Sequence, residues 1–305
     1  MSRFLSSVTL RQIQYFLVAA ETLHFTKAAQ RLSVTQPTLS HQIAELEAQL
    51  GGPLFDRVGR KVRLTESGAL LKIYADRAVR ELEAGRHALS ELEGMIRGDL
   101  RIGAIQSFSR TLLPSILGDF ITKYPGIRLN IRELTGFEIE QGLAAGTLDL
   151  GIAFSPTVLD SAEVEPILEE RLLLVVGRKN EFAKRKWVRL SELNGKSLVL
   201  LATEFLTRRL IDSYLEKVSA RPNIICETNS MEVMLGAITE SGVCTIVPEH
   251  GLRSGDERYR AIPLREPTPV RTSALLWPKH SFRSASARTF GQMMRDRFLS
   301  GRQNG

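Results

Sequence analysis

Residues 25–68 read FTKAAQRLSVTQPTLSHQIAELEAQLGGPLFDRVGRKVRLTESG, and this stretch decides the fold. Two short helical segments follow one another across the tight turn Ser33-Val34. Thr26 is expected to cap the first helix, and Thr35 the second, which has Pro37 in its first turn and ends at Gly51. Two short helices joined by such a turn are typical of a helix-turn-helix.

The outer face of the second helix carries short polar side chains at Gln36, Thr38, Ser40, His41 and Gln42. Such groups can exchange hydrogen bonds with base edges and phosphates. A solvated helix would also be polar on its outer face. Three features together favour DNA binding. They are the paired alanines at 28–29, which permit close helix packing, the short turn and the local basic excess. A preceding amphipathic helix over residues 9–21 is expected to support this pair.

Residues 54–64 predict two short strands around a glycine turn. Four cations lie on this hairpin, Arg57, Arg60, Lys61 and Arg63. We interpret it as the wing of a winged helix-turn-helix, where arginines meet phosphate or enter a narrow minor groove. The alternative is a solvated basic hairpin.

Residues 65–97 predict one continuous helix. Its apolar positions alternate at spacings of four and three, as in a coiled-coil seam, at Leu71, Ala75, Ala78, Leu82, Gly85, Leu89, Leu92 and Ile96. This helix is longer than the diameter of the small N-terminal domain before it, which favours a homodimer through this seam. The alternative is that the apolar stripe packs only on its own domain. A hinge is expected at residues 97–99.

After the hinge, strands alternate with helices, which predicts an α/β domain with a parallel sheet. The expected strands are residues 100–105, 127–133, 150–154, 172–176, 197–201, 224–227, 243–247, 259–264 and 273–277. The expected helices are residues 109–123, 136–145, 204–218, 230–241 and 284–299. We therefore divide the chain into a winged helix-turn-helix at 1–64, a linker at 65–98 and a two-lobed effector domain at 99–305. Lobe I takes about 99–160 and 258–305, and lobe II about 161–257.

Ligands of open α/β sheets bind beyond the carboxyl ends of the strands, where helix N-termini favour anions. Residues 106–109 and 202–205 form two such corners, and a small anion would suit them. The candidate effector-binding residues are Ser107, Ser109, Thr135, Phe154, Thr203, Phe205 and Asn229. Each has another explanation, because serine and threonine commonly cap helices and Phe154 could belong to the core.

The 305 residues carry a net charge of +7, and residues 1–64 alone have eight lysines and arginines against four acidic residues. That excess favours a polyanionic partner such as double-stranded DNA. The two cysteines, Cys226 and Cys244, form no zinc or disulfide pattern, so we expect neither metal nor cofactor. We find no signal peptide and no apolar run of membrane-spanning length, so a cytoplasmic protein without membrane contact is expected.

Residues 25–68 closely resemble the N-terminal signature of LysR-type transcriptional regulators, and the resemblance extends through RIGAIQSFSRTLLPSILGDFITKYPGIRLNIRELTG and LDLGIAFSP. Within the family, LVLLATEF and residues 227–248 look similar to the CynR-like regulators of cyanate-degradation operons. The resemblance implies a periplasmic-binding-protein-like effector domain, a homotetramer that binds a palindromic promoter, and bending altered by a small effector such as cyanate. RNA polymerase is a further candidate partner of such an activator.

Carried over by position, the resemblance assigns DNA contacts to the region of Thr26, Gln36, Pro37, Ser40, Arg57 and Arg60. It assigns effector-pocket positions to Ser107, Thr135, Phe154 and Thr203. The peroxide-sensing branch of the family uses a cysteine pair, but residues 200–210 contain no cysteine. Redox sensing is therefore not expected.

Two other classes of protein remain as alternatives. A periplasmic solute receptor would share the two lobes, but the DNA-binding head and the absence of a signal peptide oppose it. An enzyme would need a catalytic constellation, whereas the five histidines are scattered and accompany no nucleophile motif, phosphate-binding loop or metal cluster. We therefore predict a regulator that is not an enzyme.

Overall fold

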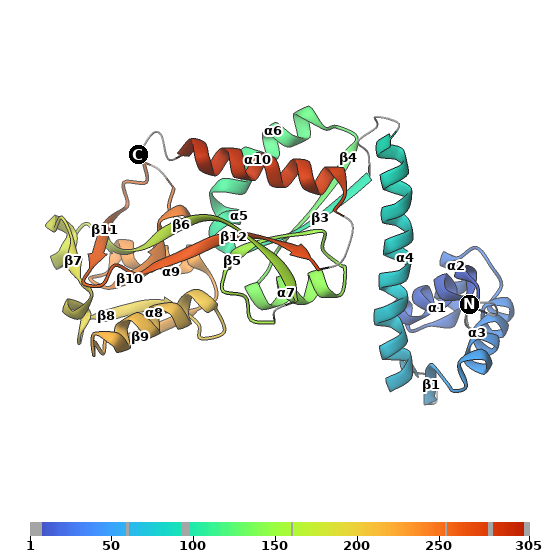
Figure 1. The fold of residues 1–305 in the computed structure, drawn as a ribbon. Helices are drawn as coiled ribbons and strands as arrows, with labels where there is room; N and C mark the ends of the chain where they lie inside the picture. The colour runs from blue at the N-terminus through green and yellow to red at the C-terminus, as the bar shows by residue number, and fades with distance from the viewer. Residues whose placement is uncertain are drawn as a thin grey trace. The chain divides into compact units, whose positions relative to one another are not determined.

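The computed structural model describes residues 8–58, 61–92, 98–159, 161–253, 255–279 and 283–301. The chain divides into two compact units, Met1–Leu89 and Ser90–Gly305, drawn from blue to cyan and from cyan to red in Figure 1. Across the described ranges, no helix combines the length and the apolar character needed to cross a membrane.

The first unit contains the predicted helix-turn-helix. Its first three helices are α1 Leu10–Thr22, α2 Phe25–Arg31 and α3 Gln36–Leu50. Their apolar faces share one core, in which Phe16, Ala28 and Leu39 are fully buried. The two alanines of α2 are buried, which allows α1 and α3 to approach it closely, as the sequence indicated.

Helix caps set these boundaries. Thr35 accepts the N–H of Thr38 at the start of α3, and Gly51 ends it in the left-handed conformation, so both predictions are confirmed. The prediction that Thr26 caps α2 is wrong. His24 is the N-cap, and its Nδ1 accepts the N–H of Lys27 at 3.4 Å.

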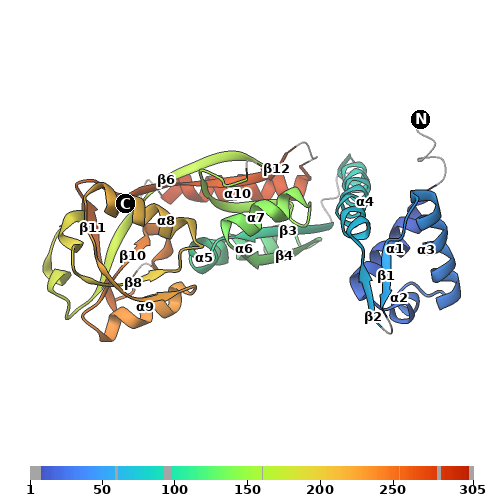
Figure 2. The same cartoon turned by 90° about the horizontal axis from the view of Figure 1, so that it is seen from below.

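The predicted hairpin is present as β1 Phe55–Val58 and β2 Lys61–Leu64, which pair antiparallel (Figure 2). Glu47 of α3 fixes the start of the hairpin, because its Oε1 accepts the N–H groups of Leu54 and Phe55 at 2.8 and 3.2 Å. The end of α3 and the first strand are therefore tied together by one carboxylate.

Helix α4, Glu66–Leu92, follows the hairpin, and the expected residues 93–97, with Ile96, lie outside the described ranges. The expected seam divides into two parts. Its first part, including Leu71 and Ala75, packs into the core of the first unit. Its second part is exposed at Leu82 and Leu89. The packing of the stripe on its own domain is therefore observed for the first part of the helix, and the homodimer through the second part stays a prediction.

The second unit is built on one long mixed sheet. The strands lie in the order β4-β3-β5-β12-β6-β10-β8-β9, with β11 pairing β6 and β7. Their bounds are β3 Gly98–Ala104, β4 Ile127–Glu133, β5 Leu150–Ser155, β6 Ala162–Gly177, β7 Val188–Arg189, β8 Ser197–Leu201, β9 Asn223–Thr228, β10 Cys244–Pro248, β11 Tyr259–Arg265 and β12 Val270–Pro278. The expected parallel pairing is present among β4, β3 and β5 and among β9, β8 and β10. It does not extend to the whole sheet, because β6 and β12 run antiparallel to their neighbours.

Strand β6 joins the two lobes. Its first ten residues pair with β12, and its last part pairs with β10 and β11. Only residues 172–176 were expected to be a strand, since the preceding residues are rich in charge. The chain also returns to lobe I later than expected: β11 pairs with the lobe II part of β6, so β12 is the returning strand.

Helices cover both lobes. They are α5 Gln106–Arg110, α6 Leu112–Lys123, α7 Gly136–Ala144, α8 Leu206–Lys217, α9 Met231–Glu240 and α10 Ala285–Gly301, with 3-10 turns η1 Glu181–Lys184, η2 Leu190–Leu193 and η3 Glu249–Gly251. The single helix expected at 109–123 is broken at Thr111 into α5 and α6.

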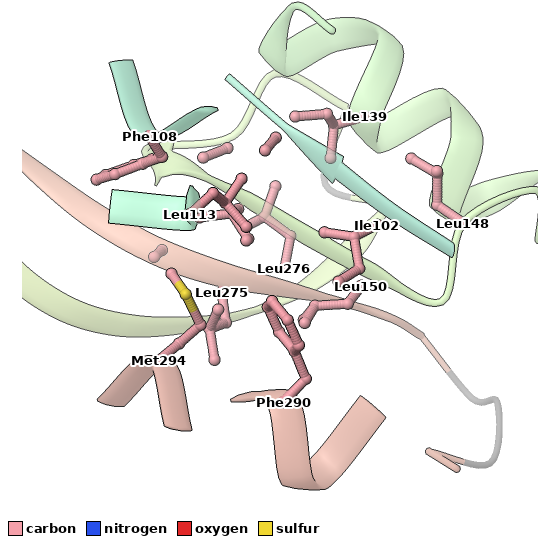
Figure 3. Close-up of a cluster of buried hydrophobic side chains, with 14 of the residues drawn as sticks. Ile102, Phe108, Leu113, Ile139, Leu148, Leu150, Leu275, Leu276, Phe290 and Met294 are labelled. Atoms are coloured by element: carbon pink, nitrogen blue, oxygen red, sulfur yellow. The ribbon is translucent and has the colours of Figure 1, made fainter. Parts of the chain in front are cut away.

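The core of lobe I holds its sheet between helices. Figure 3 shows Phe290 and Met294 of α10 on one side of the strands and Ile139 of α7 on the other. Leu275 and Leu276 of β12 point to opposite faces between them. Both faces of the lobe I sheet are buried in this core. The packing therefore fixes the strands, and the strands in turn position the side chains at their carboxyl ends.

Candidate functional site

The exposed face of α3 is the first candidate surface. Leu39, Ile43 and Leu46 are buried against the rest of the first unit. The opposite face therefore presents the predicted residues Gln36, Pro37, Thr38, Ser40 and His41, of which Ser40 is half-buried and the others are exposed.

These polar side chains of α3 bond to one another. Gln36 donates from Nε2 to Ser40 Oγ at 3.0 Å, and the hydroxyls of Thr35 and Thr38 lie 2.8 Å apart. Exposed amide and hydroxyl groups of this kind can exchange such bonds for base edges, which carry the sequence information of a duplex. The first residues of α3 suit base reading more than phosphate neutralisation, because Gln36, Thr38 and Ser40 carry no charge.

Other elements of the first unit carry exposed cations. Lys27 of α2 and Arg63 of β2 are exposed, whereas Arg31 is paired with Glu21 at 2.7 Å. Thr26 is exposed in the first turn of α2. For the predicted wing contacts, only the backbone of Arg57 is described, and Arg60 lies outside the described residues.

A small cavity of about 30 Å³ lies between the lobes of the second unit, and the space free of atoms reaches about 400 Å³ when the open solvent at its mouth is included. Its polar lining consists of Gln106, Ser107, Thr135, Thr207 and Arg271. Its apolar lining consists of Ile105, Leu134, Gly136, Phe154, Leu201, Phe205, Leu206 and Met231.

Arg271 of β12 is the cation of this cavity, and its side chain is only 1% exposed. Its Nε donates to Glu170 Oε1 at 2.8 Å, Nη1 to Thr207 Oγ1 at 2.9 Å and Nη2 to Ser107 Oγ at 2.8 Å. The guanidinium also lies over the ring of Phe154, 4.8 Å from its centroid. Strand β6, helix α5 of lobe I and helix α8 of lobe II thus each contribute one hydrogen bond that holds the guanidinium in place.

Glu170 of β6 balances this charge. It also accepts from Ser273 Oγ at 2.7 Å and lies 3.2 Å from His250 Nδ1. Burial alone would raise the pKa of Glu170, but the charge of Arg271 and the hydrogen bonds from His250 and Ser273 outweigh it and lower the pKa to about 2. The pair is therefore ionised and neutral overall at physiological pH.

Further contacts bridge the lobes beside the cavity. Gln106 Oε1 accepts the N–H of Met231 at 2.6 Å, and Arg110 donates to Glu232 and to the carbonyl of Gly251, both at 2.8 Å. These bonds join α5 of lobe I to α9 and η3 of lobe II. A ligand that moves α5 would consequently change how the lobes meet.

Four of the predicted effector-binding residues line the cavity, namely Ser107, Thr135, Phe154 and Phe205. The other three, Ser109, Thr203 and Asn229, do not belong to its lining. Thr203 is exposed in the turn before α8, where its carbonyl accepts from Arg209, and the carbonyl of Asn229 is 3.5 Å from Gln106 Nε2. Ser109 has a buried hydroxyl with no partner among the described residues.

Reasoning from the sequence missed Arg271, Glu170 and Thr207. A signal was present in the two strands, because Arg271 and Glu170 occupy inward-facing positions next to apolar runs. Charges that face inward in a strand must be paired, which would have linked the two residues. Among the described residues, no group of three histidine, cysteine or acidic side chains is arranged to hold a metal ion.

A helix-turn-helix unit followed by a two-lobed unit with a central cavity defines a DNA-binding regulator that senses a small molecule. Residues 10–69 match the bacterial regulatory helix-turn-helix proteins of the lysR family, and residues 93–299 match the LysR substrate binding domain. The chain belongs to the LysR family of transcriptional regulators, and the family consists of regulators rather than enzymes.

Known proteins resemble it over nearly their whole length. YybE of Bacillus subtilis, named as an uncharacterized HTH-type transcriptional regulator, is 30% identical over 94% of this chain and 98% of its own. A full-length OxyR variant from Pseudomonas aeruginosa superimposes with a TM-score of 0.73 at 22% identity, over 95% of this chain and 94% of that one. Full-length CbnR complexed with its target DNA gives a TM-score of 0.68 at 22% identity, covering 95% and 99%. The two structures support the fold.

Proposed function

We propose that this regulator binds its promoter through α3 and the β1–β2 hairpin, and that a small anion in the interlobe cavity changes that binding. The observation that carries the proposal is the buried Arg271, held between the lobes at the wall of a cavity, in the unit that follows a helix-turn-helix. A cation shielded from solvent at a ligand cavity is well suited to select an anionic group.

For DNA, the proposed contacts are Thr26, Gln36, Thr38, Ser40 and His41 in the helix-turn-helix and Arg57 and Arg60 in the hairpin. Pro37 would shape the first turn of α3 rather than contact a base. Uncharged side chains on α3 would read base edges, while the hairpin arginines would supply the salt-dependent attraction to phosphate.

For the effector, the proposed contacts are Ser107, Thr135, Phe154 and Phe205, to which the cavity adds Arg271 and Thr207. Cyanate enters as a candidate through the sequence resemblance alone. An effector acts only if it binds one arrangement of the lobes more tightly than the other. The bonds from α5 to Met231, Glu232 and Gly251 are where such arrangements would differ.

For assembly, we propose a homodimer through α4 and a homotetramer of two such dimers, acting as an activator in the cytoplasm with RNA polymerase as a further partner. Support comes from the exposed apolar side chains of α4, including Leu70, Ile73, Tyr74, Leu82 and Leu89. An apolar face of this kind on a regulatory protein favours a protein partner.

Fluorescence anisotropy with DNA from upstream of the protein's own gene tests the proposal. Specific binding that changes when a small anion is added is the expected result. Binding that no anion in a broad panel alters would remove the effector step, and the absence of any sequence preference would contradict the DNA-binding assignment to α3.

A further inference from the structure

We propose that lobe II carries a second ligand site, in which Arg171, Arg265 and Thr268 bind one phosphate group at a surface pocket. None of the three belongs to the lining of the interlobe cavity, so the two sites are separate. The inference goes beyond the proposed function, since it concerns neither the interlobe cavity nor the exposed face of α3.

The pocket forms where β11 separates from β6. Strand β11 pairs with β6 up to Pro263, and its next two residues, Leu264 and Arg265, pair with β7 instead. The separation leaves a pocket of about 80 Å³, whose apolar lining consists of Leu172, Leu173, Pro263 and Leu264. A single water needs roughly 10–15 Å³ of such space, so the pocket can hold a group of several non-hydrogen atoms.

The polar lining of the pocket carries no negative charge. It consists of Arg171, Arg265 and Thr268. Glu266 follows Arg265 in the chain but pairs with Arg189 at 3.1 Å. Within the described ranges, Arg265 makes no ion pair of its own, so its charge is available to a ligand.

Both arginines keep N–H groups for a ligand. Arg171 donates from Nε and Nη2 to Glu249 at 3.2 and 3.0 Å, which leaves three of the five N–H groups of a guanidinium. Arg265 lies over the ring of Trp187, 5.5 Å from its centroid, and this contact positions the guanidinium without using its N–H groups. Thr268 is exposed, and its hydroxyl has no partner among the described residues, so it adds a further donor.

Donors from three segments of the chain match a tetrahedral oxyanion better than a carboxylate. Arg171 lies on β6, Arg265 on β11 and Thr268 in the connection to β12. The two oxygens of a carboxylate can be satisfied by a single guanidinium. A phosphate group presents three acceptor oxygens and can therefore accept from all three segments at once.

The surrounding surface is strongly basic. Residues 171–196 contain eight lysines and arginines against two glutamates, in a chain whose whole net charge is +7. Five of these cations pair with carboxylates, but Lys179, Lys184 and Lys186 are exposed and have no ion pair within the part of the chain that the structure describes. Uncompensated positive charge of this kind raises the local concentration of anions.

Isothermal titration of the full-length protein without DNA, at constant ionic strength, tests the ligand class. The probes are inorganic phosphate, phenyl phosphate and acetate. We expect saturable binding of both phosphates at millimolar concentration or below. Acetate should bind this pocket at least about fivefold more weakly, because it engages one arginine instead of two.

Variants locate the binding. Arg265→Gln should weaken phosphate binding about fivefold, since a charged hydrogen bond at a partly exposed site contributes less than a buried one. Arg260→Gln removes the same charge from an exposed position of the same strand, outside the pocket lining, and should leave phosphate binding unchanged. Equal losses in the two variants would exclude this pocket as the site. Acetate that binds as tightly as phosphate and is weakened equally by Arg265→Gln would exclude the choice of phosphate.

The phosphate group can belong to a small molecule or to the backbone of DNA. Anisotropy of the duplex from upstream of the protein's own gene, over a salt series, distinguishes these sources. If DNA is the source, Arg265→Gln should reduce the slope of log K against log salt by about 0.9 relative to Arg260→Gln. If a small molecule is the source, the two slopes are equal while Arg265→Gln weakens phenyl phosphate. Equal slopes together with unchanged binding of both phosphates would overturn the inference.

Discussion

At the scale of single residues, a buried ion pair lies at the cavity wall, and its local signal is one inward-facing charge in each of two strands. Arg271 and Glu170 are 101 positions apart in the chain and lie on neighbouring strands. Ser107 and Phe154 could be predicted because parallel strands end at one edge of a sheet. Arg271 was missed because it and Glu170 lie just before the predicted strands 273–277 and 172–176, so their inward-facing positions were not recognised. Its role depends on long-range pairing that spacing along the chain does not encode.

Removing one partner of this pair should be worse than removing both. Arg271→Met leaves Glu170 buried without its cation, and we expect a loss of about 3–5 kcal/mol in the free energy of unfolding. The double variant Arg271→Met/Glu170→Leu should recover most of that loss, since no buried charge remains. Urea unfolding of the three proteins measures both quantities. A double variant no more stable than Arg271→Met would show that the pair is not the reason for the loss.

The depressed pKa of Glu170 predicts a pH dependence. A carboxyl whose pKa is lower in the folded state, about 2 against an ordinary 4.5, stabilises the fold above the unfolded value and loses that contribution as pH falls toward the folded value. The difference in unfolding free energy between wild type and Glu170→Gln should therefore be largest above about pH 5 and shrink between pH 4.5 and 2. The exposed Glu216→Gln serves as control, and a gap independent of pH would contradict the ionised state of Glu170.

At the scale of elements, helix ends were predictable and tertiary contacts were not. Thr35 and Gly51 are local signals that correctly bound α3, whereas the capping of α2 by His24 was missed because histidine is an uncommon cap. The seam of α4 was predicted as one stripe, but the sequence could not say that Leu71 is covered by its own unit while Leu82 is exposed. The division arises because the core of the first unit covers only the first part of α4.

Gly68 is needed where α4 passes the hairpin. A Cβ at this position would lie 2.1 Å from the carbonyl oxygen of Leu54, which is backbone and cannot turn aside. Gly68→Ala should destabilise the first unit by about 1–3 kcal/mol through the forced displacement. In Gly52→Ala, the added Cβ meets no described atom within 4 Å, so little change is expected. Thermal unfolding of both variants compares them, and equal melting temperatures would contradict the close packing of α4 on Leu54.

Helix α3 and the hairpin should affect DNA binding differently. Arg57→Ala should weaken binding to all sequences and reduce the salt dependence, by about 0.9 in the slope of log K against log salt for each phosphate that is no longer neutralised. Gln36→Ala should mainly relax sequence preference, because an amide that reads a base edge contributes discrimination. Anisotropy over a salt series with matched and mismatched sites separates the two. Identical salt slopes for wild type and Arg57→Ala would refute the wing assignment.

At the scale of the whole molecule, the two-lobed plan was predictable from alternating strands and helices, but the crossing between lobes was not. Strand β6 runs through both lobes and is antiparallel to both β12 and β10. It carries Glu170 at the point where its pairing passes from β12 to β10. The strand that links the lobes therefore also carries the carboxylate that balances Arg271 at the cavity wall.

The exposed side chains of α4 bear on assembly. Leu82 is 55% exposed on the part of the helix that extends past the packed seam, so a charge there costs the isolated chain little. In a dimer that buries this position, Leu82→Glu would bury two unpaired carboxylates, and we expect the protein to sediment as a monomer at micromolar concentration with a large loss of promoter affinity. Leu159→Glu makes the same substitution at a side chain that is 41% exposed in the second unit and should leave the mass unchanged. Analytical ultracentrifugation distinguishes the outcomes: if Leu82→Glu keeps the wild-type mass while Leu159→Glu does too, the dimer does not use this part of α4, and the exposed group Leu70, Ile73 and Tyr74 becomes the surface to change next.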